Sequence, residues 1–368
     1  MLLSKRFLVL IAVLLLGLVA CTGGDDADTT TDDAATDDGT EVVQEDSGST
    51  GGDTLAQVQD RGTLNCGING TLAGFSLNEG GEFTGFDVDY CKAVAAAVLD
   101  DPEAVEYVEL DADTRFTALQ SGEVDVLIRN TTWTASRDGD LGLDFTATTF
   151  YDGQGMIVKA DSEFQTLDDM QDTVICVQSG TTTELNLATV FAARGIEYEP
   201  ELNPDQEVVT GRFEEDACDG YTTDRSGLAS FRETTSGGPE SVRILDEVMS
   251  KEPLGPAVRA GDSEWRDVVN WVVLATIQAE EFELTQDNIA AYDGDDPEIL
   301  RFIGQPQGED AEFDAGLNLD KDFAVRVVEA VGNYGEIYER NVAPLGLEER
   351  GPNALWTDGG LLYAPPYR

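Results

Sequence analysis

The stretch DVDYCKAVAAAVLDDPEAVEYVEL at residues 87–110 is the part of the chain that decides the fold. Residues 87–99 predict a helix, with Asp87 as its N-terminal cap. Residues 105–109 predict a strand, and residues 64–68, which precede the helix, predict another. This order of strand, helix and strand favours an α/β layout with a mainly parallel sheet.

The same alternation continues beyond this stretch and then starts again. A second run predicts a strand at 174–178, a helix at 182–194, a short strand at Val208, a short helix at 213–216 and a strand at 220–223. Two successive α/β units predict two lobes between which the chain crosses twice, with residues 54–153 and 258–368 in lobe 1 and 154–257 in lobe 2. The remaining predicted elements are a helix at 114–121, strands at 124–128 and 156–159, a short apolar segment at 242–245, and helices at 263–281 and 321–331, the last leading on to Arg340.

The N-terminus has the pattern of a bacterial lipoprotein signal peptide. Lys5 and Arg6 precede an apolar run over 7–20 that is short for a membrane span. The run ends in Leu-Val-Ala directly before Cys21, and a polar stretch follows. We therefore expect residues 1–20 to be removed and Cys21 to carry lipid; an ordinary signal peptide or a short signal anchor is the alternative.

Residues 21–53 have the composition of an extended tether. Eleven acidic residues and no basic residue lie between Asp25 and Asp53, so this segment repels itself and has little apolar surface to bury. We expect it to be disordered and to link the lipid on Cys21 to the folded body.

Composition excludes several classes of function. The 368 residues carry a net charge of −51, which repels nucleic acid and anionic lipid headgroups. The chain contains no histidine, so no Ser-His-Asp or Cys-His arrangement and no His-ligated metal site can form. We expect no cofactor and no metal.

Four cysteines remain besides Cys21, an even number for a protein outside the cytoplasmic membrane. Four cysteines allow three pairings. We favour Cys66–Cys91 and Cys176–Cys218, because each pair lies within one predicted lobe. Four buried free thiols are the alternative.

Several motifs together carry a family resemblance over about residues 54–368. They are GFDVDYC (85–91), RFTALQSGEVDV (115–126), RNTTWTASRD (129–138), YDGQG (151–155), QSGTTTE (178–184), YTTD (221–224), KEPLGP (251–256), GNYGE (332–336) and Leu355-Trp356 to Pro365-Pro366. With these motifs the chain resembles the polar amino-acid class (family 3) of ABC-transporter solute-binding proteins, nearest to the general L-amino-acid binding proteins. This resemblance implies a two-lobed periplasmic-binding-protein-like fold of type II, with two hinge-crossing strands and a ligand cleft between the lobes.

The resemblance also implies which residues hold the ligand. Arg137 looks like the arginine that clamps the α-carboxylate, since a guanidinium fork matches a carboxylate; a surface arginine paired to Asp138 is the alternative. Asp224 looks like the second-lobe acceptor of the α-ammonium, with a turn or cap role as the alternative. The polar loop and helix N-terminus expected around them comprise Asn130, Thr132, Thr181 and Thr182, although Thr182 could also be a plain helix residue.

The wall for the ligand side chain is less well marked. Phe75 and Leu72 lie in the loop after the first predicted strand, where relatives often place an aromatic residue against the ligand. Phe116 is another candidate. For Phe75 and Phe116, packing in the hydrophobic core is an equal alternative. Residues 293–298 resemble a calcium loop superficially but lack its ligand spacing, so we expect a solvated turn.

These expectations describe a lipid-anchored, extracytoplasmic, monomeric protein of an ABC importer, on the periplasmic face or the cell surface. It would capture L-amino acids by lobe closure and deliver them to a permease with its ATPase subunits. We expect no enzymatic activity and no nucleic-acid partner. An amino-acid sensing receptor module and a dehydratase-like enzyme on the same scaffold are the alternatives.

Overall fold

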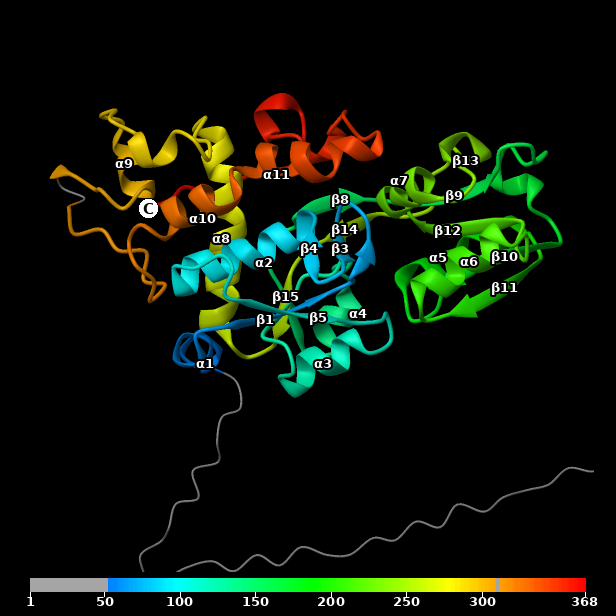
Figure 1. Ribbon diagram of the computed structural model, residues 1–368, viewed down its shortest axis with the longest axis horizontal. Coiled ribbons are helices and arrows are strands. Elements are labelled where there is room, and N and C mark those ends of the chain that lie inside the picture. Colours follow the sequence, from blue (N-terminus) through cyan, green and yellow to red (C-terminus); the bar gives the residue numbers. More distant parts are fainter. Residues whose placement is uncertain (1–51, 309–310) are drawn as a thin grey trace, which may run out of the picture. The chain divides into compact units, whose positions relative to one another are not determined.

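The computed structural model describes residues 52–308 and 311–368. The expected signal peptide, Cys21 and nearly all of the expected tether lie outside these residues. Within the described part, two five-stranded sheets organise the chain (Figure 1). Helices flank both sheets, as the alternation of strands and helices in the sequence predicts.

The first sheet has the strand order β5-β1-β6-β15-β7. Strand β1 is parallel to β5 and β6, whereas β15 is antiparallel to β6 and β7. Helices α2 and α3 pack on this sheet. The elements are α1 (Thr54–Arg61), β1 (Leu64–Ile68), α2 (Phe86–Leu99), β5 (Val105–Glu109), α3 (Arg115–Ser121), β6 (Val126–Leu127), α4 (Ala135–Gly139), β7 (Leu143–Phe145) and β15 (Ala257–Arg259). A small antiparallel sheet of β2 (Thr71–Leu72), β3 (Ser76–Glu79) and β4 (Glu82–Thr84) follows β1.

The second sheet has the order β11-β10-β12-β9-β13. Strand β10 is parallel to β11 and β12, and β9 is antiparallel to β12 and β13. Helices α5, α6 and α7 contact its strands (Figure 1). The elements are β9 (Gln154–Lys159), β10 (Thr173–Gln178), α5 (Thr182–Arg194), β11 (Tyr198–Asn203), α6 (Gln206–Glu214), β12 (Gly220–Asp224), α7 (Arg225–Thr234) and β13 (Val242–Ile244).

Two short antiparallel strands, β8 (Phe150–Asp152) and β14 (Glu252–Leu254), carry the chain into and out of the second sheet. Tyr151 lies opposite Pro253, which has no N–H to donate. The side chain of Asn353 instead satisfies Tyr151: its Oδ1 accepts from the backbone N–H at 2.7 Å, and its Nδ2 donates to the carbonyl oxygen at 3.1 Å. The C-terminal segment therefore holds the outer edge of this hinge.

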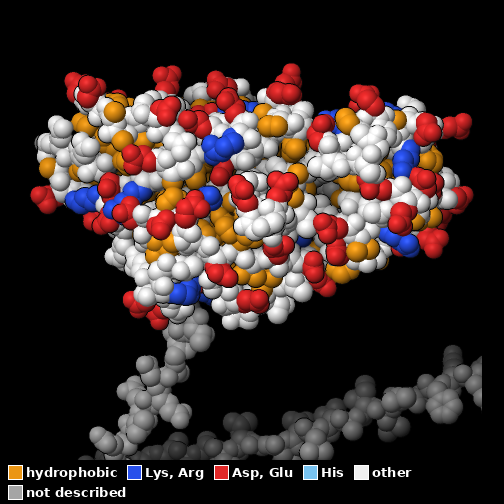
Figure 2. Space-filling model, viewed as in Figure 1, with side chains coloured by type: hydrophobic (Ala, Val, Ile, Leu, Met, Phe, Trp, Pro, Cys, Tyr) orange, Lys and Arg blue, Asp and Glu red, His pale blue; other side chains and the backbone are white. Residues whose placement is uncertain are grey.

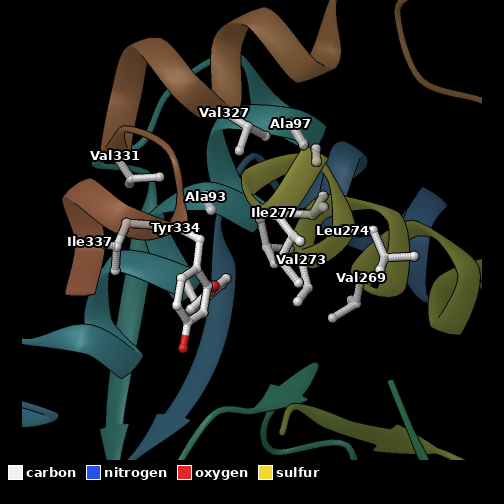
Figure 3. Close-up of a cluster of buried hydrophobic side chains, with 14 of the residues drawn as sticks. Ala93, Ala97, Val269, Val273, Leu274, Ile277, Val327, Val331, Tyr334 and Ile337 are labelled. Atoms are coloured by element: carbon white, nitrogen blue, oxygen red, sulfur yellow. The ribbon is translucent and has the colours of Figure 1, made fainter. Parts of the chain in front are cut away.

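Helices near the C-terminus complete the hydrophobic core of the first lobe. They are α8 (Ser263–Glu281), α9 (Pro297–Phe302), α10 (Phe323–Val331) and α11 (Tyr334–Asn341). Figure 3 shows Ala93 and Ala97 of α2 near Val273 and Ile277 of α8, together with apolar side chains of α10 and α11. Tyr334 is fully buried there, and its hydroxyl donates to the carbonyl oxygen of Thr149 at 2.8 Å. The small alanines allow the helices to approach closely.

The structure contains the two disulfides that the sequence favours. Cys66 of β1 is joined to Cys91 of α2, and Cys176 of β10 is joined to Cys218 just before β12. Each disulfide therefore joins two segments of the same lobe. Neither bond crosses the hinge, so both are compatible with movement of one lobe against the other.

Three details of the sequence prediction are wrong. Helix α2 begins at Phe86 after Gly85, and Asp87 makes no cap; Gly85 has φ of 128°, and a Cβ there would lie 2.2 Å from the Phe75 carbonyl oxygen. Val208 lies in helix α6, not in a strand, and this helix also includes Phe213 and Glu214, the first half of the segment expected as a separate helix at 213–216. Helix α10 is separate from α11, which has its own capping box at Asn333.

The segment that resembles a calcium loop has a structural role. Asp296 is the N-cap of α9, and its carboxylate accepts from the backbone N–H groups of Glu298 and Ile299. Within residues 52–308 and 311–368, no cluster of three or more acidic, cysteine or histidine side chains could hold a metal ion.

The visible surface carries many more acidic than basic side chains (Figure 2), in agreement with the 73 acidic and 22 basic residues of the chain. None of the helices in the described part is both long enough and apolar enough to cross a bilayer.

Candidate functional site

Arg137 is a buried cation at the edge of the first sheet. It lies in the short helix α4, where the Thr134 hydroxyl caps its backbone N–H. Its Nη1 donates to the carbonyl oxygen of Thr132 at 2.9 Å, and its guanidinium carbon lies 5.0 Å from the centre of the Phe116 ring. Burial lowers the pKa of Arg137, while Glu252 and Asp224 act in the opposite direction. The alternative of a surface arginine paired to Asp138 is therefore wrong.

The loop before Arg137 is fixed by a buried carboxylate. Asn130 has φ of 33°, a conformation that asparagine tolerates better than most residues, and its N–H donates to Asp87 Oδ2 at 2.8 Å. Burial raises the pKa of Asp87 to about 7, although the Asn130 N–H and Arg129 oppose this shift. Asp87 thus holds the loop that ends at Thr132, a role that its position in the sequence did not suggest.

Asp224 is a buried carboxylate with an unsatisfied oxygen. It ends β12 and precedes α7, yet its side chain makes no cap hydrogen bond, so the cap alternative is wrong. Its Oδ1 is enclosed and has no hydrogen-bond partner. Burial and the carboxylates of Asp152 and Glu252 raise the pKa of Asp224 well above its ordinary value, while Arg137 and Arg115 oppose the shift. An enclosed carboxylate oxygen of this kind is suited to receive a cationic donor.

Thr181 and Thr182 begin helix α5 as expected. The Thr181 hydroxyl accepts from the backbone N–H of Glu184 and donates to the Gln178 carbonyl oxygen at 2.6 Å, so it serves the helix itself. The Thr182 hydroxyl donates to Glu252 Oε2 at 3.0 Å and lies 3.4 Å from the Thr132 hydroxyl. Thr182 therefore joins the second sheet both to the hinge and to the Arg137 loop.

Another contact joins the two lobes near this point. Asn69, which follows β1, donates from Nδ2 to Oε1 of Gln206 in α6 at 3.0 Å. With the pair of Thr132 and Thr182, this contact shows that the two lobes meet in the structure. The residues of the site are thus brought together in a closed arrangement.

Two hinge carboxylates belong to the same group of charges. Glu252 of β14 is buried and accepts from Thr182, Asn186 and Ser250. Asp152 of β8 accepts from the backbone N–H groups of Gly153 and Ser226. Burial raises the pKa of Asp152 to about 6. Both lie in stretches that carry the family resemblance, YDGQG and KEPLGP, but the sequence alone did not assign them to the site.

The expected hydrophobic wall is only partly present. Phe75 is fully buried and packs edge-on against Phe150, and Leu72 belongs to the same core cluster. Both are therefore core residues in this structure. Phe116 is half-buried and has the guanidinium groups of Arg115 and Arg137 over its ring, at 4.7 and 5.0 Å. Of the three candidates, only Phe116 contacts the charged group.

Three further buried polar residues near the site were missed. Arg115 and Gln154 each have an enclosed atom without a hydrogen-bond partner, Nε and Oε1 respectively. Arg129 is buried and donates from Nε to the Leu110 carbonyl oxygen at 2.8 Å. Arg115 and Arg129 stand in the stretches RFTALQSG and RNTTW, so the family motif was the one signal that could have found them.

Comparison with known proteins identifies the family. The sequence profile described as "Bacterial extracellular solute-binding proteins, family 3" matches residues 64–289. The chain belongs to this family. The family-3 protein is 46% identical over 335 residues to the general L-amino acid-binding periplasmic protein AapJ of Rhizobium johnstonii, which covers 90% of this chain and 97% of AapJ. It is 49% identical over 330 residues to the glutamate/glutamine/aspartate/asparagine-binding protein BztA of Rhodobacter capsulatus, with 88% and 95% covered.

A solved structure supports the same assignment. The ABC transporter/periplasmic binding protein from Brucella ovis with glutathione bound has a TM-score of 0.81 and 46% identity, and the match covers 86% of this chain and 99% of that one. The family-3 protein therefore has the two-lobed, periplasmic-binding-protein-like fold that the sequence predicts. Its C-terminal part beyond residue 289, which contains Asn353, lies outside the family profile.

Proposed function

We propose that this protein captures L-amino acids outside the cytoplasmic membrane and delivers them to the permease and ATPase subunits of an ABC importer. One observation carries the proposal: the buried guanidinium of Arg137 and the unpartnered carboxylate of Asp224 come from different lobes and are close enough to shift each other's pKa. A free amino acid carries the complementary pair of charges, a carboxylate and an ammonium group, on the same carbon atom.

The proposed mechanism uses the two lobes in turn. In an open form, Arg137 and the loop from Asn130 to Thr132 take the α-carboxylate. Closure then brings Asp224 to the α-ammonium and the Thr182 hydroxyl to the loop. Because the ligand contacts both lobes only in the closed form, it stabilises that form, and the permease would recognise it. The names of AapJ and BztA, both amino-acid-binding proteins, agree with this proposal.

The test is a ligand screen with the purified protein. Thermal unfolding is measured with each of the twenty L-amino acids, and calorimetry follows for each ligand that raises the melting temperature. A ligand present at about 1,000 times its Kd should add about 4 kcal/mol to the free energy of unfolding. Glutathione belongs in the screen because the Brucella ovis relative binds it. The matched control for each amino acid that binds is the amine with the same side chain but without the α-carboxylate. This amine has no group for Arg137 to bind, so stabilisation of the protein by it would contradict the role of Arg137.

We also propose that lipid on Cys21 anchors the protein to a membrane. The proposal rests on the apolar run before Leu-Val-Ala-Cys21 and the acidic segment after it. A Cys21→Ser variant cannot carry the lipid, so it is expected to move from the membrane fraction to the soluble fraction or to keep its signal peptide. In either case it should still bind ligand. Fractionation and mass spectrometry of the N-terminal peptide measure this change. An unmodified Cys21 in the mature protein would rule the anchor out.

A further inference from the structure

The C-terminal part of the chain, which lies outside the family profile, touches both lobes. Its helices α10 and α11 pack on α2 and α8 of the first lobe. The segment 343–353 then forms two short 3-10 turns, Ala343–Leu345 and Gly351–Asn353. The first turn contacts helix α7 of the second lobe, and the second contacts the hinge strand β8. We call residues 343–353 the brace.

The brace is fixed to the first lobe by polar contacts. The Tyr338 hydroxyl of α11 donates to the Leu347 carbonyl oxygen at 2.9 Å. Arg350 donates two hydrogen bonds to the Glu280 carboxylate of α8, and its Nε donates to the Asn353 carbonyl oxygen at 3.0 Å. These contacts tie both ends of the brace to helices of the first lobe, so the brace moves with that lobe.

The brace and the ligand-binding loop lie at opposite edges of the two hinge strands. At the free edge of β14, the Pro253 carbonyl oxygen accepts from the N–H of Trp133, the residue after Thr132, at 2.8 Å. At the free edge of β8, Tyr151 bonds to Asn353 of the brace. Figure 1 agrees, since α7 and α11 appear above these strands and α4 and α6 appear below them. The hinge strands thus separate the brace from the cleft.

Helix α7 of the second lobe already touches the brace in this closed arrangement. Arg232 of α7 donates from Nη2 to the Leu345 carbonyl oxygen at 3.3 Å. Ala229 of α7 is buried in the same core cluster as Leu345, a cluster whose other members come from the first lobe and the hinge. A Cβ atom at Gly346 would lie 2.7 Å from Arg232 Nη2, so little space separates α7 from the brace at this point.

Opening of the cleft must disturb this contact. A rotation about the hinge strands that draws Thr182 away from Thr132 also moves α7 relative to the brace on the opposite side. The pair of Arg232 and Leu345 opposes a closer approach of α7, and withdrawal of α7 breaks its hydrogen bond. Either change raises the free energy of the open form, so the contact favours the closed form.

We propose that the brace, through its contact with Arg232, shifts the equilibrium between the open and closed forms toward closure. Arg232 is therefore a positioning residue, which acts on the ligand through the hinge. This inference rests on the proposed function, because closure is the step that captures the ligand there. A change at the brace alters the population of the closed form, so it should change the affinity for every amino acid by the same factor.

The first measurement needs no ligand. Nitroxide labels on cysteines at the exposed positions Glu123 and Val208 report the distance between the lobes by pulsed electron resonance. Val208 lies on α6, which meets the first lobe in the closed arrangement through Gln206. The Cys21→Ser background leaves no other free cysteine, since the remaining four form disulfides. An Arg232→Ala variant should populate longer distances than the wild-type protein.

The second measurement is calorimetry of the full protein with L-glutamate and with L-leucine. We expect Arg232→Ala to weaken both about tenfold and by the same factor, within the usual range for coupling between separate sites. The matched control is Arg194→Ala. Arg194 is exposed to a similar extent as Arg232, but its partners Asp168 and Glu247 belong to its own lobe, so this variant should keep the wild-type distances and affinities.

The outcomes separate the brace from the proposed function. Melting temperatures without ligand show whether each variant folds; if Arg232→Ala does not, the Arg232→Met data decide. Unchanged distances and affinities would overturn the brace. Tighter binding would assign the contact to the open form, and a changed preference between the two ligands would place Arg232 in the cleft; either result also overturns it. If the wild-type protein binds no amino acid, the proposed function fails, while the distances still decide whether the brace favours closure.

Discussion

Replacement of Arg137 by alanine is expected to weaken the binding of every amino acid by about 100-fold or more. The buried guanidinium is the charged partner expected for the α-carboxylate, a group that all amino acids share. Loss of one partner of a buried charge pair costs about 2–5 kcal/mol, which corresponds to this range of affinity. Alanine also removes the hydrogen bond from Nη1 to the Thr132 carbonyl oxygen, so the loop keeps its contact with Asp87 but loses the one with Arg137. Calorimetry with glutamate and leucine measures the effect.

Two variants make this prediction sharp. Arg137→Lys keeps the charge but cannot form the fork, so it should recover only part of the affinity. Arg212→Ala removes a half-exposed arginine of α6 that pairs with Glu201, and it should bind like the wild-type protein. The ligand-free Arg137→Ala protein should melt near the wild-type temperature, because loss of the guanidinium also removes the free-energy cost of burying its charge. Wild-type affinity in Arg137→Ala would show that the carboxylate binds elsewhere.

The elements of the fold were predictable where local signals and packing agree. Helices over 182–194 and 263–281 were expected with the bounds that α5 and α8 have. In α5, Thr181 supplies the N-terminal cap and Gly195 ends the helix in the left-handed conformation. Both residue types indicate in the sequence where this helix begins and ends. Helix α8 likewise has Asp262 as its cap.

The wrong prediction at Val208 shows that packing can override the local preference of valine for a strand. Two adjacent valines favour a strand. In the structure, Asp205 caps helix α6 by accepting from the N–H groups of Glu207 and Val208. Val209 and Phe213, four residues apart, then face the core of the second lobe. The cap and this spacing were present in the sequence, but they matter only because a sheet lies beneath the helix.

The charged site was only partly predictable for a different reason. Arg137 and Asp224 stand in recognisable motifs, but the partners of a buried charge depend on which distant segments meet. Glu252 accepts from Thr182, 70 residues earlier, and Asp87 accepts from the backbone of Asn130. No local pattern states that Arg115 is enclosed or that Phe75 packs against Phe150. Such contacts depend on which distant segments pack together, and they require the structure.

Replacement of Asp224 by asparagine is expected to have opposite effects on stability and on binding. Without ligand, burial and the carboxylates of Asp152 and Glu252 raise the pKa of Asp224 well above its ordinary value. A carboxyl group whose pKa is higher in the folded state makes the protein less stable as the pH rises above its unfolded pKa of about 3.9. Asparagine removes this penalty, so the ligand-free variant should melt at a higher temperature near pH 7. It should bind amino acids about 100-fold more weakly, since it cannot pair with the ammonium group.

The pH dependence of the stability difference between the wild-type protein and Asp224→Asn identifies Asp224 as the cause of that difference. Burial also raises the pKa of Asp152 to about 6 and of Asp87 to about 7, so the ligand-free wild-type protein should lose stability from about pH 4 to 7 through several groups. The difference between the wild-type protein and Asp224→Asn isolates one of them, and it should grow with pH. Ligand binding should also release protons from the wild-type protein, because the ammonium group lowers the pKa of Asp224. Calorimetry in two buffers of different ionisation enthalpy counts these protons. Equal proton release in the variant would assign the linkage to Asp152 or Asp87 and remove Asp224 from the ammonium site.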